Sequence, residues 1–586
     1  MIKLFKNFTK KDKLIIVVVA VLVVFSVYLD LKLPEYMSDI TKLVQTENSS
    51  MNEIINAGIH MMICAVVSLI CTIICGYFTS LLAANFSMNV RRKVFSKVED
   101  FGTSEIKKFS TSSLITRTTN DITQIEMLLS MGLHLLIKSP VMAVWALIKI
   151  VEKSSDLSVI TFIGVVIIVV TNLFIISRVS PRFEKIQKLT DKLNGVTREN
   201  LTGIRVIRAF NAEEFQEERF DNVNEELTNT HLTVQKTFAI MQPMMNFVMH
   251  FQHLGIYFIG AFIIINSNMI DKINTFSNMV VFSSYGMQVI ISFLMLTMIF
   301  MILPRARVSA RRINEVLDED IDVLDGNFDG DTKTTGVVEF KKVSFKYPDA
   351  DEDVLKDISF KVNKGETIAF IGSTGSGKST LINLVPRLYD VTSGEVLVDG
   401  VNVKEYKLSS LNNKIGYIPQ KAVMFTGSVE ENIKYGDNGK GTPSDKKVEE
   451  AIRVAQAEEF VLKMKGKYKS HIARGGTNVS GGQKQRLSIA RAIARDPEIY
   501  IFDDSFSALD YKTDATLRSE LKKYTKDATV MIVAQRIGTI MNADKIVVLD
   551  KGECVGIGTH KELLKKCDVY KEIALSQLSE EELANA

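Results

Sequence analysis

The sequence predicts a multidomain chain in which a six-helix, all-α transmembrane domain is followed by an α/β domain. Three observations support this fold class. Apolar residues make up 46% of the 586 residues and are concentrated in the first half. Six apolar runs in that half are each long enough to cross a bilayer as a helix of about 20 residues. In the second half, strand-like and helix-like stretches alternate from Gly336 onward, which is typical of a largely parallel core sheet.

Composition shifts along the chain predict the domain boundaries. We expect the transmembrane domain at 1–317, a linker at 318–335 and the α/β domain at 336–586. The linker is acidic and contains glycine, which favours an irregular connection. The net charge of the chain is only +3, and it has no basic run interleaved with aromatic residues. We therefore expect no nucleic-acid partner.

Charge in the loops predicts how the spans are oriented. The expected spans are 14–29, 56–84, 128–151, 157–177, 238–265 and 277–303. The N-terminal segment and the loops at 85–127 and 178–237 are rich in Lys and Arg, so they are expected in the cytoplasm. A signal peptide is the alternative for the first run, but no small-residue cleavage site follows it. The chain is therefore expected to be a multi-pass protein of the cell membrane, with its second half cytoplasmic.

The two long inner loops keep helical apolar spacing despite their charge. We expect them to prolong the membrane helices into the cytoplasm and to end in reversals that touch another domain. The candidate reversals are 112–117 and 201–210.

A glycine-rich loop in the second half fits the pattern G-x-x-x-x-G-K-[ST]. An apolar strand precedes it and a helix follows it, so a chance match is disfavoured. Glycines let backbone N–H groups close around phosphate oxygens, Lys378 is expected to reach the β- and γ-phosphates, and the Ser379 hydroxyl is expected to ligate Mg²⁺. The expected phosphate contacts are Gly372, Ser373, Thr374, Gly375, Ser376, Gly377, Lys378, Ser379 and Thr380. Asp503 ends a later apolar strand and is placed to hold the Mg²⁺ shell through water.

Between these two motifs lies the stretch Val479-Ser480-Gly481-Gly482-Gln483. With it, the chain resembles the ATP-binding cassette (ABC) family, and with six spans ahead of the cassette it resembles an ABC exporter half-transporter over nearly its full length. The resemblance implies ATP and Mg²⁺ as cofactors. It also implies that two cassettes pair head to tail, so that each ATP lies between one chain's phosphate loop and the other chain's signature. The residues expected to contact the partner's ATP are Ser480, Gly481, Gly482 and Gln483.

The resemblance also assigns roles to single residues. Tyr347 matches the aromatic residue that stacks on adenine, and Gln420 matches the glutamine that approaches Mg²⁺. Two positions depart from the family pattern. Asp504 stands where the family has the glutamate that polarises the attacking water, and Gln535 stands where it has a switch histidine. The expected catalytic residues are therefore Gln420, Asp504 and Gln535, and the site that they form is expected to be impaired.

The two departures predict a heterodimer whose partner, a second half-transporter, carries the consensus glutamate and histidine. We expect ATP-driven export of an amphipathic small molecule or peptide, with hydrolysis mainly at the partner's site. A homodimer that turns over slowly and an ATP-gated regulator or channel subunit are the alternatives. An exporter with its own processing protease is disfavoured because nothing precedes the first span.

Polar residues recur on one face of the fifth span. Gln242, Asn246, His250 and His253 follow one another at spacings of four, four and three residues. Hydrogen bonding between helices is one explanation. A cavity lining that contacts substrate is the other, since polar groups within the membrane avoid lipid and often mark transport pathways. Methionines flank this face, as packing residues or as an adaptable surface for varied apolar ligands.

Overall fold

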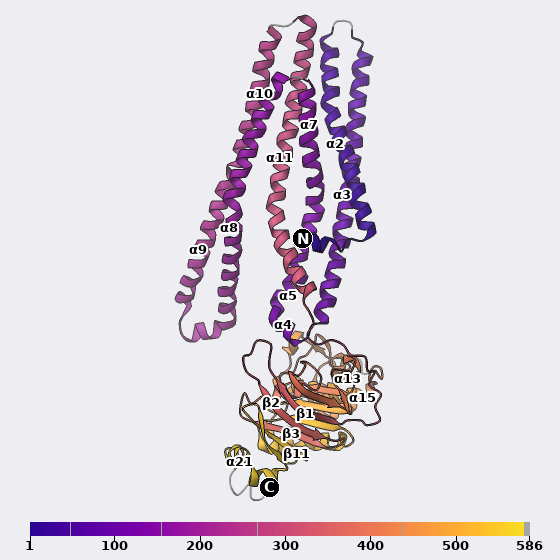
Figure 1. Ribbon diagram of the computed structural model, residues 1–586, viewed down its shortest axis with the longest axis vertical. Helices are drawn as coiled ribbons and strands as arrows, with labels where there is room; N and C mark the ends of the chain where they lie inside the picture. Colours follow the sequence, from indigo (N-terminus) through magenta and orange to yellow (C-terminus); the bar gives the residue numbers. More distant parts are fainter. Residues whose placement is uncertain (47–48, 154, 266–267, 437–438, 579–586) are drawn as a thin grey trace. The chain divides into compact units, whose positions relative to one another are not determined.

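The protein forms two compact units in the computed structural model (Figure 1). The described residues are 1–46, 49–153, 155–265, 268–436 and 439–578. The first unit comprises 1–99 and 111–319 and is built from long helices. The second comprises 100–110 and 320–586 and has an α/β fold.

The first unit contains six helical stretches that are long and apolar enough to cross a membrane, which confirms the predicted number of spans. Each expected apolar run lies within one of them. The main helices are α2 (Lys10–Gln45), α3 (Met51–Glu99), α7 (Leu133–Lys153), α8 (Ser155–Ala209), α9 (Glu213–Ala239), α10 (Met241–Ile265) and α11 (Met269–Asp318). The shorter α5 (Thr111–Thr118), α6 (Asn120–Met127) and a π-helical turn (Leu128–Gly132) lead into α7.

The expected prolongation of the membrane helices is present. Helix α8 has 55 residues and is therefore roughly 80 Å long, more than twice the ~30 Å hydrocarbon core of a bilayer. The chain reverses between α8 and α9, at the second expected reversal. Helices α8, α9 and α10 run together in Figure 1, whereas α7 packs beside α11 and α2 beside α3.

Ion pairs tie α2 to α7 within the helical unit. Asp30 lies 3.1 Å from Lys138, and Glu35 lies 3.2 Å from Lys149. The Tyr285 hydroxyl of α11 donates to the backbone oxygen of Leu31 at 3.0 Å, so the third helix joins the same cluster. Charges within a membrane domain are costly unless they are paired, and these are paired.

The second unit is organised around a six-stranded sheet with the order β12-β11-β3-β10-β9-β6. Five strands of this sheet, β11, β3, β10, β9 and β6, are parallel, as predicted. The edge strand β12 is antiparallel to β11. The bounds are β3 (Thr367–Gly372), β6 (Ile415–Ile418), β9 (Ile499–Asp503), β10 (Thr529–Val533), β11 (Lys545–Asp550) and β12 (Glu553–Gly558). β9 and β10 are buried along their whole length, which explains their continuous apolar sequence.

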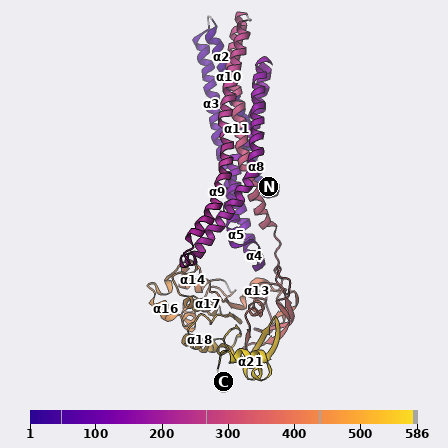
Figure 2. The ribbon, with the colours of Figure 1, turned by 90° about the vertical axis from the view of Figure 1, so that its left-hand side faces the viewer.

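Helices pack against the parallel sheet. Figure 2 shows α14 (Val429–Ile433), α16 (Glu458–Lys463), α17 (Gly481–Arg495) and α18 (Tyr511–Tyr524) gathered on one side of this unit. Their apolar faces form one buried cluster with the outer face of the sheet. The unit also contains the helices α12 (Lys378–Asn383), α13 (Leu408–Asn413), α15 (Asp445–Val454), α19 (Ile537–Ile540), α20 (His560–Lys566) and α21 (Asp568–Leu575).

A second, antiparallel sheet lies in the same unit and was not expected from the sequence. Its order is β2-β1-β4-β5, formed by β1 (Val338–Phe345), β2 (Leu355–Val362), β4 (Ser393–Val398) and β5 (Val401–Asn402). Strand β2 alternates buried and exposed residues, so one face of this sheet packs on the core and the other faces solvent.

The short helix α4 (Thr103–Phe109) belongs to the second unit although it comes from the first inner loop. Glu105 in this helix is 2% exposed, and its Oε1 accepts the backbone N–H of Asp322 at 2.8 Å. The segment that packs on the α/β core is therefore 100–110, immediately before the expected 112–117.

A buried ion-pair network stabilises the α/β unit. Lys414 Nζ lies 2.8 Å from Asp399 and 3.1 Å from Glu498. Asp399 also accepts the backbone N–H of Val337 at 2.9 Å. Burial opposes the charge on Lys414, but the hydrogen bonds to Asp399 and Glu498 outweigh it and raise the Lys414 pKa.

Removing the cation from this network should destabilise the unit. Lys414→Met leaves the Asp399 carboxylate buried without its counter-ion, which costs about 3–5 kcal/mol. We expect a lower urea midpoint and faster hydrogen exchange in β4 and β6 of the full chain. Lys364→Met, at an exposed lysine of the same unit, is the control and should change neither. The double variant with Asp399→Asn should recover part of the loss; equal exchange in Lys414→Met and the control would contradict this account.

Candidate functional site

The glycine-rich loop connects β3 to α12 and has the geometry that close approach to a ligand requires. A Cβ on Gly372 would lie 2.0 Å from the backbone oxygen of Leu549, so no larger residue fits there. Gly377 caps α12 with φ +94°, a conformation that favours glycine. The loop therefore turns sharply onto a helix N-terminus, with its backbone N–H groups available to phosphate oxygens.

Lys378 folds back over this loop. Its Nζ donates to the backbone oxygens of Gly372 at 2.8 Å and Ser373 at 2.7 Å, and to Ser376 Oγ at 3.3 Å. Burial lowers the pKa of Lys378, and the nearby Asp504 and Asp503 carboxylates only partly offset this. The ammonium group is thus held in the concavity where phosphate oxygens would bind.

Ser379 and Asp503 meet at the carboxyl end of the sheet. The Ser379 hydroxyl donates to Asp503 Oδ1 at 2.7 Å. Burial raises the pKa of Asp503, as does the neighbouring Asp504. A buried carboxylate and a hydroxyl oxygen side by side fit the oxygen ligand set of Mg²⁺, whose charge would compensate the buried anion. These two residues are the ones that could hold the metal.

Asp504, Gln420 and Gln535 form one hydrogen-bonded cluster. Asp504 Oδ2 accepts the amide N–H of Gln535 at 2.8 Å and that of Gln420 at 3.3 Å. Asp504 is 8% exposed, and burial raises its pKa while the two amides lower it. The three residues expected at the catalytic position are therefore brought together from strand ends far apart in the sequence. Gln420 follows β6, Asp504 follows β9 and Gln535 follows β10.

Tyr347 lies at the edge of the loop. Its hydroxyl is 2.9 Å from Thr380 Oγ1, and its ring packs edge-on against Tyr389. The ammonium of Lys107, in α4, lies 5.0 Å from the centroid of the Tyr347 ring, within the range of a cation–π contact. Sequence reasoning missed Lys107, because nothing in the local sequence links the first inner loop to a residue 240 positions later.

The Ser480–Gln483 stretch starts helix α17. Ser480 is the N-cap residue, and its hydroxyl and backbone exchange hydrogen bonds with Gln483 in a capping box. Ser480 and Gly481 are exposed. Within the described part of the chain, no hydrogen bond or ion pair joins Ser480, Gly481, Gly482 or Gln483 to the phosphate loop. The structure thus does not bring these two motifs together in one chain.

The polar face of α10 points largely away from the core of its own chain. Gln242, Asn246 and His250 are exposed, and His253 is half-buried. Gln242 donates to Asn246 at 3.4 Å within the same helix. The helix-to-helix hydrogen bond is made instead by Gln252, which is 2% exposed and donates to Thr161 of α8 at 3.4 Å. Within the described chain, the exposed Gln242, Asn246 and His250 are thus open to a cavity, a partner chain or lipid.

Comparison with known proteins identifies both halves. Residues 14–303 match the family model described as the ABC transporter transmembrane region, and 355–507 match the model described as ABC transporter. An uncharacterised ABC transporter ATP-binding protein of Mycobacterium tuberculosis is 39% identical over 528 residues, 89% of each chain. An ATP-dependent lipid A-core flippase of Aliivibrio fischeri is 31% identical over 503 residues, 85% of this chain and 84% of the flippase.

Two further comparisons agree. A provisionally named multidrug export ATP-binding/permease protein of Staphylococcus aureus is 31% identical over 496 residues, 83% of each chain. A bacterial Atm1-family ABC exporter solved with ATP bound superposes with a TM-score of 0.81 and 22% identity, covering 97% of this chain and 99% of that one. At this identity the structural likeness shows the fold.

The contact between Ser379 and Asp503 predicts a metal-dependent effect on nucleotide binding. Ser379→Ala removes one oxygen from the ligand set, so ATP affinity in the presence of Mg²⁺ should fall roughly tenfold or more. Affinity without Mg²⁺ should change little. Titration with a fluorescent ATP analogue, with and without Mg²⁺, measures both. Ser519→Ala, which removes an exposed hydroxyl on α18 of the same unit, is the control. The same loss with and without Mg²⁺ would show that Ser379 only shapes the loop.

Proposed function

This chain belongs to the ABC transporter family, as an exporter half-transporter with its membrane and nucleotide-binding domains in one polypeptide, and we propose that it forms the impaired half of a heterodimeric exporter of amphipathic compounds. The chain is a multi-pass membrane protein whose nucleotide-binding domain is cytoplasmic, and it binds ATP. The observation that carries the heterodimer proposal is the Asp504 cluster, in which one short carboxylate accepts hydrogen bonds from both Gln420 and Gln535.

This cluster suits ATP binding better than water activation. An aspartate is one methylene shorter than glutamate, and a misplacement of about 1 Å can cost on the order of 100-fold in rate. Burial raises the Asp504 pKa, but the oxygen that would accept a proton from water already accepts two amide hydrogen bonds, so an attacking water would have to compete with them for it. Gln535 can hydrogen-bond a γ-phosphate but cannot carry a positive charge.

The residues expected to bind ATP are all present in the same half-site. On this proposal Tyr347 stacks on adenine, Lys378 contacts the β- and γ-phosphates, and Ser379 and Asp503 hold Mg²⁺, with Gln420 beside it. The metal, when bound, neutralises phosphate charge. The chain would therefore hold ATP firmly and hydrolyse it slowly.

The exposed signature supports pairing with a second chain. Ser480 and Gly481 make no described hydrogen bond with this chain's own phosphate loop and are exposed, as a surface that completes a partner's site requires. A partner with a glutamate and a histidine at the two departed positions would hold the competent site. Among the curated relatives, one is named for lipid flipping and another for multidrug export, which supports an amphipathic substrate.

Two alternatives make different predictions. A homodimer of this chain would purify alone and turn over slowly at two equivalent sites, whereas the heterodimer should co-purify from native membranes with a second, different half-transporter. An ATP-gated regulator or channel would not concentrate its cargo. ATP-dependent, uphill accumulation of a dye in inside-out vesicles excludes it.

Single substitutions in the purified pair should separate the two ATP sites. Ser480→Arg places a bulky cation against the partner's γ-phosphate and should reduce ATPase activity at least roughly 10²-fold, equivalent to about 3 kcal/mol of barrier. Asp504→Ala should have a much smaller effect, and Asp504→Glu should bring little gain while Gln535 remains. Steady-state phosphate release measures all three. The heterodimer assignment fails if Asp504→Ala is as damaging as Ser480→Arg.

The polar face of α10 should act on cargo rather than on nucleotide. Replacing Asn246 and His250 with leucine removes polar groups that are proposed to contact substrate, so the range of dyes moved, or their apparent affinity, should change more than basal ATPase activity. Dye accumulation and ATPase assays on the same vesicles test this. Phe262→Leu, further along α10, serves as the apolar control. A uniform loss for every dye together with poor expression would point to a packing role.

A further inference from the structure

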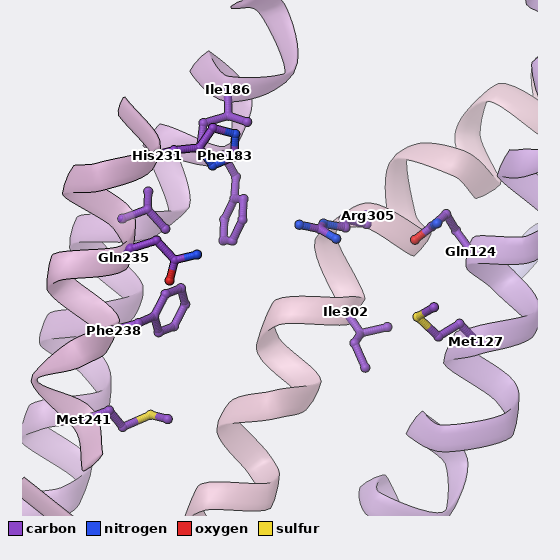
Figure 3. Close-up of a pocket in the computed structure, with 11 residues that line it drawn as sticks. Gln124, Met127, Phe183, Ile186, His231, Gln235, Phe238, Met241, Ile302 and Arg305 are labelled. Atoms are coloured by element: carbon purple, nitrogen blue, oxygen red, sulfur yellow. The ribbon is translucent and has the colours of Figure 1, made fainter. Parts of the chain in front are cut away.

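The helical unit contains a cavity of about 420 Å³, between α8, α9 and α10 on one side and α6 and α11 on the other (Figure 3). Phe183 and Phe238 project into it from one side, and Ile302 and Arg305 project from the other. Within the described part of the chain, no hydrogen bond joins its polar lining residues to one another, so their geometry does not specify a ligand. These residues are Gln124, His231, Gln235 and Arg305. The α/β unit, by contrast, holds an organised polar cluster beside the metal carboxylate Asp503.

Tyr417 lies on the same face of the parallel sheet as Asp503. In the register of β6 with β9, Tyr417 pairs with Ile501, and Asp503 follows Ile501 by two residues. Side chains two residues apart on a strand point to the same face of the sheet. The register therefore places the Tyr417 phenol on the face where α12 packs and where Asp503 is buried at the end of β9.

The Tyr417 hydroxyl lies between two acceptors. It donates to Asn383 Oδ1 at 2.9 Å, and it also lies within hydrogen-bonding reach of the Asp503 carboxylate. A phenol carries one proton, so it can donate to only one of these groups at a time. Burial raises the pKa of Asp503, and hydrogen bonds from Ser379 and Tyr417 oppose this rise. Two hydroxyls thus support the ionised form of this carboxylate.

The other supports of Asp503 come from one face of α12. Asn383 follows Ser379 by four residues, which places the two side chains on the same face of the helix. Ser379 donates to Asp503 Oδ1 at 2.7 Å, and Asn383 accepts from Tyr417. Side chains of α12, β9 and β6 therefore form a closed polar ring, which consists of Ser379, Asp503, Tyr417 and Asn383.

We propose that Tyr417 is a positioning residue for the metal carboxylate. Its hydroxyl, held by Asn383, fixes the orientation of Asp503, so that the Mg²⁺ shell meets a carboxylate that is already in place. Hydrogen bonds to a ligating carboxylate typically contribute 10–100-fold to metal affinity. The inference deepens the proposed function and rests on it in one respect, namely that Mg²⁺ binds beside Ser379 and Asp503.

The gain in nucleotide affinity that Mg²⁺ brings tests this role. A fluorescent ATP analogue is titrated into the full-length chain with excess Mg²⁺ and again with EDTA, and the ratio of the two dissociation constants gives the gain. Tyr417→Phe keeps the ring but removes the hydroxyl, so the gain should fall about tenfold. Affinity in EDTA should stay close to that of the native chain. An unchanged or larger gain overturns the proposal, even if affinity falls in both conditions.

A second variant separates positioning from packing. Asn383→Ala removes the acceptor that holds the Tyr417 hydroxyl, so it should lower the same gain by less than Tyr417→Phe does. Because both changes act through one hydroxyl, the double variant should be no worse than Tyr417→Phe alone. Losses that multiply in the double variant would contradict the proposal. The control is Tyr468→Phe, at a half-buried tyrosine whose side chain makes no hydrogen bond with the described residues, and it should leave the gain unchanged.

The result is separable from the proposed function. Binding is measured without hydrolysis or transport, so a homodimer, or an efficient Asp504 site, leaves it unaffected. Ser379→Ala tests the metal site itself. If that variant leaves the gain unchanged, Mg²⁺ is not bound there, and the proposed metal site and the role of Tyr417 fail together. A loss in Ser379→Ala with no loss in Tyr417→Phe refutes only the role of Tyr417.

Discussion

The register of three neighbouring parallel strands is the constraint on which the nucleotide site depends. Val533 at the end of β10 pairs with Phe370 in β3 and with Asp503 in β9. The residues that follow these three strands must therefore emerge at one edge of the sheet. The phosphate loop, the carboxylate pair and Gln535 come from different parts of the chain, and a slip of one residue in either pairing would turn their side chains to opposite faces.

That constraint explains which parts of the site could be predicted. The phosphate loop is a local motif flanked by an apolar strand and a helix, so Lys378 and Ser379 could be assigned from sequence. The juxtaposition of Asp504 with Gln420 and Gln535 could be expected only from a family resemblance, since periodicity does not fix the order of strands in a sheet. The antiparallel sheet was missed for a related reason. Its strands β1 and β2 have eight residues each with alternating apolar positions, but such a pattern does not determine which strands pair or in which direction.

In the helical unit, hydropathy predicted the number of spans, and apolar spacing within the Lys- and Arg-rich loops predicted the extension of the helices. Neither predicted which spans pack together. The Asp30–Lys138 and Glu35–Lys149 pairs and the cavity beside Arg305 all join helices distant in sequence. A signal was nevertheless present, because Lys138 and Lys149 are charges inside a run expected to cross the bilayer. Such charges need partners, and asking where those partners lie would have paired the first span with the third.

At the nucleotide site, the residues expected to bind ATP follow the family pattern, whereas two residues expected to act in hydrolysis depart from it. The residues suited to holding ATP, Lys378, Ser379 and Tyr347, keep the family pattern and are held by hydrogen bonds within the cassette. The departures from that pattern fall on Asp504 and Gln535, which bond directly to each other. The two changes therefore share one hydrogen bond of 2.8 Å, from the Gln535 amide to Asp504 Oδ2. Restoring one position alone would thus change the hydrogen bond between the buried Asp504 and the exposed Gln535, so the two departures are coupled rather than independent.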